Sequence, residues 1–249
     1  MKNSEKNNLF AQTQISNYGR IVQVYEFGAR IGSNGKIQKS KHFHLEFLEQ
    51  GSRVLYPGPG WGIEVNEAAK KELVPTVIEL DSKMLRRAKK TFKDSGLINQ
   101  IECIQGDVLD HKRYNYYDYI VANYFLDVFS KNTMPEVFAH LVSLLKPGGK
   151  MFLSGYAPLM GSKLHRLMQW VNHLYANFFC KIIVNNALHD IYDYEAYFKQ
   201  LGLISDGYHD FKHCDSYGPR FHRVWVATKL DSSNSFNKKY PRSPIFTDA

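Results

Sequence analysis

The amino-acid sequence predicts an α/β protein built on a seven-stranded, mostly parallel β-sheet with helices on both faces. Two observations lead to this fold class. From residue 53 onward, short runs of β-branched and aromatic residues alternate with segments of helical periodicity, the order typical of a parallel sheet. The final two strand-like runs are joined only by HCDSYGPRF, which is too short for a crossover helix. They therefore predict an antiparallel hairpin and a reversed last strand.

The individual elements follow from turn and cap residues. Asp81 or Ser82 is expected to cap a helix, and Thr133-Met-Pro-Glu136 is typical of a capping box at the start of another. Lys146-Pro-Gly-Gly149 should end that second helix before the next strand. The predicted strands are 53–56, 76–80, 101–105, 117–122, 150–154, 204–212 and 222–229.

Composition sets broad limits on function. A chain of 249 residues with 44% hydrophobic residues suffices for one large domain with its own core. The net charge of +8 would attract nucleic acid, acidic lipid or an anionic small molecule without choosing among them. Three widely spaced cysteines predict neither a disulfide framework nor a zinc site. With no apolar run long enough for a signal peptide or a membrane span, we expect a cytoplasmic protein.

The stretch VLYPGPGWG, residues 54–62, runs from a strand into three alternating glycines and then a helix. Such a loop brings bare backbone N–H groups and a helix N-terminus close to a ligand. Glu79 ends the next strand, 21 residues after Gly58, where a carboxylate can accept hydrogen bonds from both hydroxyls of a ribose. An adenosine-type ligand is expected, either a dinucleotide or S-adenosylmethionine. The dinucleotide fingerprint needs a glycine where Ile63 stands, which disfavours pyrophosphate.

The block from Val54 to Gly155 resembles the class I S-adenosylmethionine-dependent methyltransferases. VLYPGPGWG resembles their first motif, VIELDSKML the ribose-binding strand and helix, and IQGDVLD the adenine motif. YDYIVANYFLD and LLKPGGKMFLSG resemble the fourth strand and the helix-stop-strand motif, all in the family's order. The resemblance implies a Rossmann-like fold with a helical lid, methyltransferase activity and S-adenosylmethionine as cofactor.

The resemblance also assigns positions to the cofactor. It places the methionyl part on the backbone of Gly58, Pro59 and Gly60 and the ribose on Glu79. The adenine ring would contact the remaining positions of the second and third motifs, which are Leu80, Met84, Asp107 and the backbone of Val108. Asn123 and Tyr124 would lie beneath the reactive methyl group, and for Asp107 a turn role after Gly106 is the alternative.

Tyr56 departs from the family, which usually has Asp or Glu at this position to neutralise the methionyl ammonium. A tyrosine brings no charge at neutral pH because its ordinary pKa is about 10. We expect Tyr56 still to line the cofactor site, with the ammonium met by backbone carbonyls, by Asn123 or by the N-terminal segment.

The insertion at residues 156–190 is predicted to form a lid. Its apolar residues recur at helical spacing, and no Asp or Glu occurs between Val137 and His189. This favours a small aromatic, quinone-like or lipid acceptor methylated at oxygen or carbon, although the apolar stripe could instead pack on the sheet or on a second subunit. His189 and Tyr124 are the candidate catalytic residues. Asn123-Tyr-Phe-Leu126 lacks the Pro-Pro pair typical of enzymes that methylate amino groups.

The predicted organisation is a flexible tail at 1–15, a helical cap at 16–50, a methyltransferase domain at 51–230 and a second flexible tail at 231–249. The expected partner is a small-molecule acceptor; no membrane span and no metal site are expected. The alternatives are an RNA or protein methyltransferase, a non-catalytic S-adenosylmethionine-binding protein and a nicotinamide-dependent oxidoreductase. Nucleic acid is the less favoured partner, and the sequence does not indicate an oligomeric state.

Overall fold

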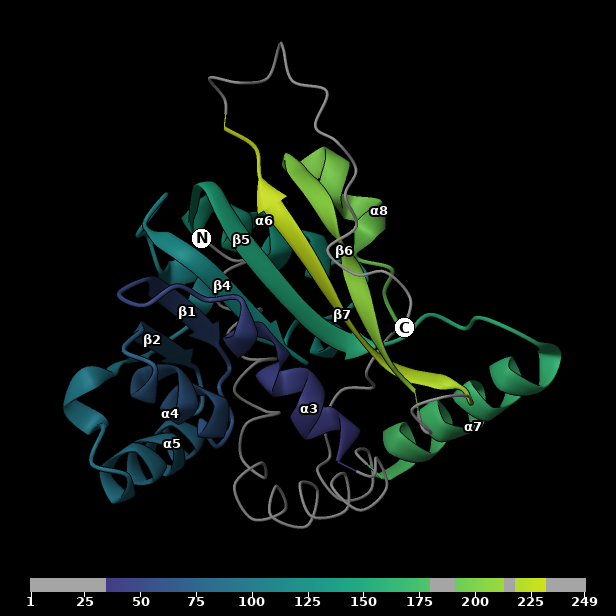
Figure 1. Ribbon diagram of the computed structural model, residues 1–249, viewed down its shortest axis with the longest axis horizontal. Helices are drawn as coiled ribbons and strands as arrows, with labels where there is room; N and C mark the ends of the chain where they lie inside the picture. Colours follow the sequence, from purple (N-terminus) through teal and green to yellow (C-terminus); the bar gives the residue numbers. More distant parts are fainter. Residues whose placement is uncertain (1–34, 180–190, 213–217, 232–249) are drawn as a thin grey trace, which may run out of the picture.

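A seven-stranded sheet forms the centre of the computed structural model, which describes residues 35–179, 191–212 and 218–231 (Figure 1). The strand order is β3-β2-β1-β4-β5-β7-β6. Only β7 runs against its neighbours, pairing antiparallel with both β5 and β6. The predicted fold class is confirmed. The strands are β1 Arg53–Pro57, β2 Val74–Glu79, β3 Glu102–Gln105, β4 Tyr117–Asn123, β5 Leu145–Tyr156, β6 Leu203–Lys212 and β7 Arg220–Lys229.

Helices cover both faces of this sheet. α3 (Lys36–His42), the 3₁₀ segment η1 (Phe43–Glu46), α4 (Ile63–Lys70) and α5 (Ser82–Asp94) lie on one face, and α6 (Met134–Leu144) and α8 (Glu195–Phe198) on the other. α7 (Lys163–Phe179) projects from the edge of the molecule. Short 3₁₀ segments complete the described elements: η2 Ile98–Gln100, η3 Val108–Asp110, η4 Leu126–Val128 and η6 Lys199–Leu201.

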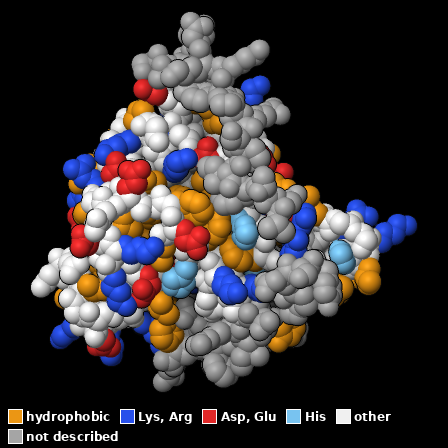
Figure 2. Space-filling model, viewed as in Figure 1, with side chains coloured by type: hydrophobic (Ala, Val, Ile, Leu, Met, Phe, Trp, Pro, Cys, Tyr) orange, Lys and Arg blue, Asp and Glu red, His pale blue; other side chains and the backbone are white. Residues whose placement is uncertain are grey.

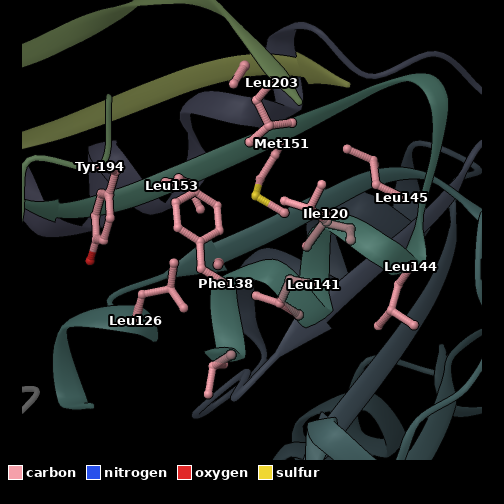
Figure 3. Packing of buried hydrophobic residues seen from close by; sticks show 14 of the residues in the cluster. Ile120, Leu126, Phe138, Leu141, Leu144, Leu145, Met151, Leu153, Tyr194 and Leu203 are labelled. Atoms are coloured by element: carbon pink, nitrogen blue, oxygen red, sulfur yellow. The ribbon is translucent and has the colours of Figure 1, made fainter. Parts of the chain in front are cut away.

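The core consists of two buried clusters, one on each face, because successive strand residues point to opposite sides. On β1, Leu55 belongs to the cluster beneath α6, while Val54 and Tyr56 belong to the cluster beneath α4 and α5. Figure 3 shows the first cluster, in which Phe138 of α6 and Tyr194 lie against the strand residues. The parallel strands are thus buried on both sides, as the sequence pattern predicts.

The two predicted helix starts have different outcomes. The carboxylate of Asp81 accepts hydrogen bonds from the backbone N–H groups of Lys83 and Met84, which confirms the cap of α5. The capping box at Thr133 is wrong: Thr133 makes no side-chain cap hydrogen bond, and its hydroxyl lies 3.1 Å from that of Ser130. Its backbone is already helical (φ −96°, ψ −34°), whereas a capping side chain needs an extended backbone to reach N2 or N3.

The end of α6 also differs from the prediction. Lys146-Pro-Gly-Gly149 stops the helix but belongs to β5, which begins directly at Leu145. On β4, Tyr117 pairs with Leu145 and Tyr119 with Lys150, so residues 146–149 of β5 bulge out of the pairing. Within the described ranges, no helix is long and apolar enough to cross a membrane, and no group of three ligand-type side chains is placed to hold a metal ion.

Gly62 provides a test of how α4 packs on α5. Its φ is +70°, and an added Cβ would lie 2.4 Å from the buried ring of Phe92. We expect Gly62→Ala to lower the free energy of unfolding by about 2–4 kcal/mol, the sum of left-handed strain and overpacking. Gly96→Ala is the matched control, since Gly96 has a φ of +72° and no atom within 4 Å of an added Cβ. Equal losses in urea unfolding for the two variants would contradict the packing argument.

Candidate active site

The glycine loop lies where β1 meets α4, at the carboxyl edge of the sheet. The backbone N–H of Gly58 donates to the carbonyl of Ile78, which fixes the loop to β2. Gly60 has a φ of +57° and no atom within 4 Å of an added Cβ. The loop therefore presents accessible backbone at Gly60, beside the start of a helix, whereas Pro59 is buried and the ring of Phe125 fills the space at Gly58.

Glu79 ends the neighbouring strand β2. One of its carboxylate oxygens accepts a hydrogen bond from the N–H of Asp81 at 3.0 Å. Burial is the largest influence on this group and raises the pKa of Glu79 to about 7. Leu80, the next residue, leaves 43% of its surface exposed. A largely desolvated carboxylate beside an open apolar side chain suits a ribose joined to a flat base.

The positions expected near the adenine differ in accessibility. Asp107 is exposed and starts η3, where one of its oxygens accepts a hydrogen bond from the N–H of Leu109 at 2.9 Å. The turn role considered for Asp107 is thus present in the structure. Val108 and Met84 are buried in the protein core at 5% and 3% exposure. Of these side chains, Asp107 is the one open to a ligand.

Tyr56 is bound within the protein. Only 1% of its surface is exposed, and a 2.8 Å hydrogen bond joins its hydroxyl to Nε2 of His44 in η1. Burial, followed by the charge of Glu64, raises the pKa of Tyr56 well above its ordinary value, so the hydroxyl stays protonated. Burial likewise lowers the pKa of His44 to about 3 and keeps the imidazole neutral. Tyr56, which stands where the family motif usually has an acid, thus has its own hydrogen-bond partner in His44.

Glu64 is a residue that the sequence analysis missed. It stands in the first turn of α4 and is 5% exposed. Its carboxylate accepts a hydrogen bond from Nδ2 of Asn123 at 3.4 Å, and its charge acts on Tyr56. An acid therefore lies close to the position where the family motif has one, reached from the helix instead of the strand. Its place just after Gly62, at a helix N-terminus that favours carboxylates, was the available signal.

Asn123 connects four elements at the carboxyl edge. Its amide nitrogen donates to the carbonyl of Lys41 at 3.1 Å as well as to Glu64, and its oxygen accepts from the hydroxyl of Ser154 at 2.7 Å. Because both ends of the amide are used, Asn123 holds α3, α4 and β5 against β4. The side chain of Asn123 thus links these elements.

Tyr124 has a strained backbone, with a φ of +52° that few non-glycine residues adopt. Its hydroxyl lies 2.8 Å from the hydroxyl of Ser40. Burial raises the pKa of Tyr124 well above its ordinary value, so the phenol remains protonated at neutral pH. A protonated Tyr124 can donate a hydrogen bond or offer a ring face.

Aromatic rings gather beside Tyr124. Its ring centroid lies 6.2 Å from that of Tyr156 and 5.7 Å from that of His222. His173 of α7 packs on Tyr156 with ring centroids 5.1 Å apart. These four rings, here called the aromatic cluster, come from the ends of β4 and β5, the start of β7 and one helix. The sequence analysis did not single out Tyr156, His173 or His222.

Comparison with known proteins bears on this arrangement. Residues 54–149 match a family model described as a methyltransferase domain. The chain carries a methyltransferase domain. The matched segment contains the glycine loop, Glu79, Asp107 and Asn123, and it confirms the resemblance found in the motifs. The strand order is the one that class I S-adenosylmethionine-dependent methyltransferases share, so the matched residues form a methyltransferase domain with that fold. No curated protein sequence matches the chain.

Solved structures share the fold at low sequence identity. A putative methyltransferase from Bacillus halodurans is 14% identical with a TM-score of 0.58, over 78% of this chain and 99% of that one. A 1,6-didemethyltoxoflavin N1-methyltransferase from Burkholderia thailandensis is 14% identical with a TM-score of 0.60, over 90% of each chain. An O-methyltransferase family protein from the same organism is 16% identical with a TM-score of 0.62, over 88% of this chain and 63% of that one.

α7 lies within the segment predicted to form a lid. α7 faces the body of the protein with Gln169 and Asn177, which are buried, and with His173. The apolar side chains of α7 named below are exposed and do not pack on the sheet; Figure 2 shows hydrophobic and basic side chains together on its outer end. The exposed apolar residues are Leu164, Leu167, Met168, Trp170, Val171, Leu174 and Tyr175. His189, the other candidate catalytic residue, lies outside the described residues.

Three features of this methyltransferase fit S-adenosylmethionine. Gly60 leaves open space where the methionyl part is expected, and the exposed Leu80 offers an apolar surface for the base. The largely buried carboxylate of Glu79 can accept hydrogen bonds from ribose hydroxyls in addition to the one from Asp81. No basic side chain is needed at the loop, because this cofactor has no phosphate. The residues present therefore suit the cofactor that the family uses.

The raised pKa of Glu79 predicts a pH-dependent affinity for S-adenosylhomocysteine. Ribose hydroxyls donate to the ionised carboxylate, so binding releases a proton wherever the free protein holds one. With a pKa of about 7, the affinity should rise about tenfold between roughly pH 6 and pH 8, measured by titration calorimetry. Glu79→Gln should bind more weakly with a flat profile. Glu102→Gln, at an exposed acid paired with Arg113, should keep the slope; a flat wild-type profile would refute this role of Glu79.

Proposed function

We propose that the protein transfers a methyl group to a small, aromatic or apolar acceptor at oxygen or carbon. The observation that carries this proposal is the aromatic cluster of Tyr124, Tyr156, His173 and His222 at the carboxyl edge of the sheet. Flat ring faces favour an apolar or aromatic acceptor over a charged one. The solved toxoflavin methyltransferase holds a small heteroaromatic molecule together with S-adenosylhomocysteine, which supports an acceptor of this size in this fold.

The chain's contribution to the reaction is alignment. The bound cofactor supplies a methyl group already activated on a sulfonium, so the protein needs to orient the acceptor and exclude water. Tyr124 and Tyr156 would bound the acceptor with their rings, and the hydroxyl of Tyr124 is held by Ser40 of α3. The strained backbone of Tyr124 supports a functional reason for its fixed position.

Glu64 is proposed as the acid that meets the methionyl ammonium. Its carboxylate is buried, and Asn123 holds it at the edge beside the glycine loop. This assignment separates two functions that the family motif combines: Tyr56 fills space and binds His44, while Glu64 carries the charge. The cofactor thereby keeps an acidic partner despite the tyrosine.

The remaining organisation is proposed on the same basis. The cap proposed for 16–50 includes α3 and η1, and the lid proposed for 156–190 includes α7. The parts of these segments at 16–34 and 180–190, and the tails proposed at 1–15 and 231–249 apart from residue 231, lie outside the described residues. We place the protein in the cytoplasm on the composition of its sequence. An RNA or protein acceptor remains the rival that the experiment below separates.

Methyl-labelled S-adenosylmethionine provides the decisive test. The protein would be incubated with a set of simple phenols, naphthols and hydroquinones, and in parallel with total RNA and with a mixed protein extract. We expect label in the small-molecule fraction and background label in the other two. Label in RNA, together with salt-dependent retention on heparin, would replace the proposed acceptor with nucleic acid. Binding of S-adenosylhomocysteine without transfer to any acceptor would favour the non-catalytic alternative.

The role of Glu64 predicts a specific pattern of affinities for S-adenosylhomocysteine. Glu64→Gln removes a charge-assisted contact and should weaken binding about 10–100-fold by titration calorimetry. Tyr56→Phe loses only the hydrogen bond to His44 and should stay within about threefold. Glu67→Gln is the matched control on the same helix, because Glu67 is exposed and pairs with Lys70. A larger loss in Tyr56→Phe than in Glu64→Gln would return the cofactor role to the tyrosine.

A further inference from the structure

The reversal of β7 brings its first residues to the carboxyl edge of the sheet. His222 lies directly opposite Tyr156 in the antiparallel register, as Val224 lies opposite Ser154. Paired residues share a face, so His222 points to the same side as Ser154 and Tyr156, where α3 covers the sheet. The imidazole thus stands in the aromatic cluster, 5.5 Å from the ring centroid of Tyr156.

The imidazole of His222 is buried with an unfilled polar position. The residue is 2% exposed, and its Nδ1 has no hydrogen-bond partner among the described residues. An unpaired buried nitrogen costs about 1–3 kcal/mol, so each such group in a native protein needs a reason. Nδ1 of the equally buried His44 also has no partner there, but its Nε2 is bonded to Tyr56 inside the core, whereas the rings around His222 belong to residues at the carboxyl edge of the sheet.

The surroundings of His222 keep its ring neutral. Tyr124 and Tyr156 contact it with aromatic rings, and burial alone lowers the pKa of His222 to about 3. A neutral imidazole has one nitrogen that accepts a hydrogen bond. The ring can therefore receive a donor from an uncharged molecule lying against the two tyrosines.

Neighbouring contacts hold the backbone of His222 in place. The guanidinium of Arg223 makes two hydrogen bonds to the carboxylate of Asp210 on β6, at 2.6 and 3.0 Å. The side chain of Gln169 on α7 donates to the carbonyl of Arg220. The start of β7 is thus fixed from both sides, which suits a residue that must orient a substrate.

We infer that His222 binds the hydroxyl of an aromatic acceptor and takes its proton during methyl transfer. This inference rests on the proposed function and names its acceptor class: a hydroxylated aromatic molecule whose ring lies against Tyr124 and Tyr156. His222 is therefore a catalytic residue in the sense that it touches the reacting group.

The step balances without a further reagent. A lone pair of the acceptor oxygen forms the new O–CH₃ bond, the carbon–sulfur bond breaks, and its electron pair remains on sulfur. The hydroxyl proton moves to the imidazole of His222 and then to water. An oxygen that is gaining a methyl group is far more acidic than an imidazolium, so even a weakly basic histidine accepts this proton.

Binding of 1-naphthol and 1-methylnaphthalene to the complex with S-adenosylhomocysteine tests the inference without turnover. The two probes have similar shapes, and only the naphthol donates a hydrogen bond. We expect the ratio of their affinities to fall about tenfold in His222→Phe, which keeps the ring and removes both nitrogens. In wild-type protein labelled with ¹⁵N-histidine, one neutral histidine should show an Nδ1 shift with the naphthol and none with the methylnaphthalene.

Turnover provides the second readout. His222→Phe should lower kcat for 1-naphthol by about 100-fold or more while leaving the affinity for S-adenosylhomocysteine unchanged. His209→Phe is the matched control, since His209 on β6 stacks on Phe43, away from the aromatic cluster. If His222→Phe fails to fold, His222→Asn is the second variant. Its amide oxygen can still accept a hydrogen bond, so it should keep part of the preference for 1-naphthol over 1-methylnaphthalene.

The outcomes separate the two proposals. Naphthol binding with an unchanged affinity ratio in the folded variants and no histidine shift would overturn the role of His222 and leave the aromatic acceptor standing. S-adenosylhomocysteine binding with no binding of either probe would overturn both the acceptor class and the inference. Loss of S-adenosylhomocysteine binding in His222→Phe alone would place the histidine in the cofactor site and also contradict the inference.

Discussion

The hydrogen bonds of Asn123 are the interaction on which the site depends. Parallel pairing aligns the carboxyl ends of the strands at one edge of the sheet. The hydrogen bonds between strands do not hold a helix over that edge. Asn123 provides this link through Lys41, Glu64 and Ser154, which come from α3, α4 and β5. Each of its polar atoms has a partner, so this half-buried amide specifies one arrangement at little cost. The glycine loop and Tyr124 are held on either side of it.

The reversed strand β7 is the second constraint. A seventh strand running parallel to the others would place its first residues at the amino edge, far from the cofactor. Antiparallel pairing with β5 instead sets His222 opposite Tyr156, and β6 secures it through Asp210 and Arg223. The hairpin thus does more than close the sheet, because it delivers a polar group to an otherwise aromatic surface.

Tyr56 shows how a motif residue can change while the chemistry around it is kept. The side chain moves into the core, where His44 satisfies its hydroxyl and both rings pack against each other with centroids 5.5 Å apart. The acid proposed to replace it is Glu64, in the first turn of α4. Strand and helix residues meet at the same point of the edge, so either can supply an acid there. A motif read position by position overlooks this exchange.

The sequence by itself determined the seven strands, the reversed last strand, the cap at Asp81 and the cofactor loop, because periodicity, turn residues and glycine spacing are local properties of the chain. It failed at Thr133, where the backbone is already helical, and it did not find Glu64, Tyr156 or His222. Only the tertiary structure decided the contact between Tyr156 and His222, which arises from pairing of β5 with β7, and the contact between Glu64 of α4 and Asn123 at the end of β4. The same holds for α7, whose apolar stripe indicated a packed face, whereas Gln169 and Asn177 make the buried contacts. Periodicity shows that a helix has two faces, but only packing determines which one is turned inward.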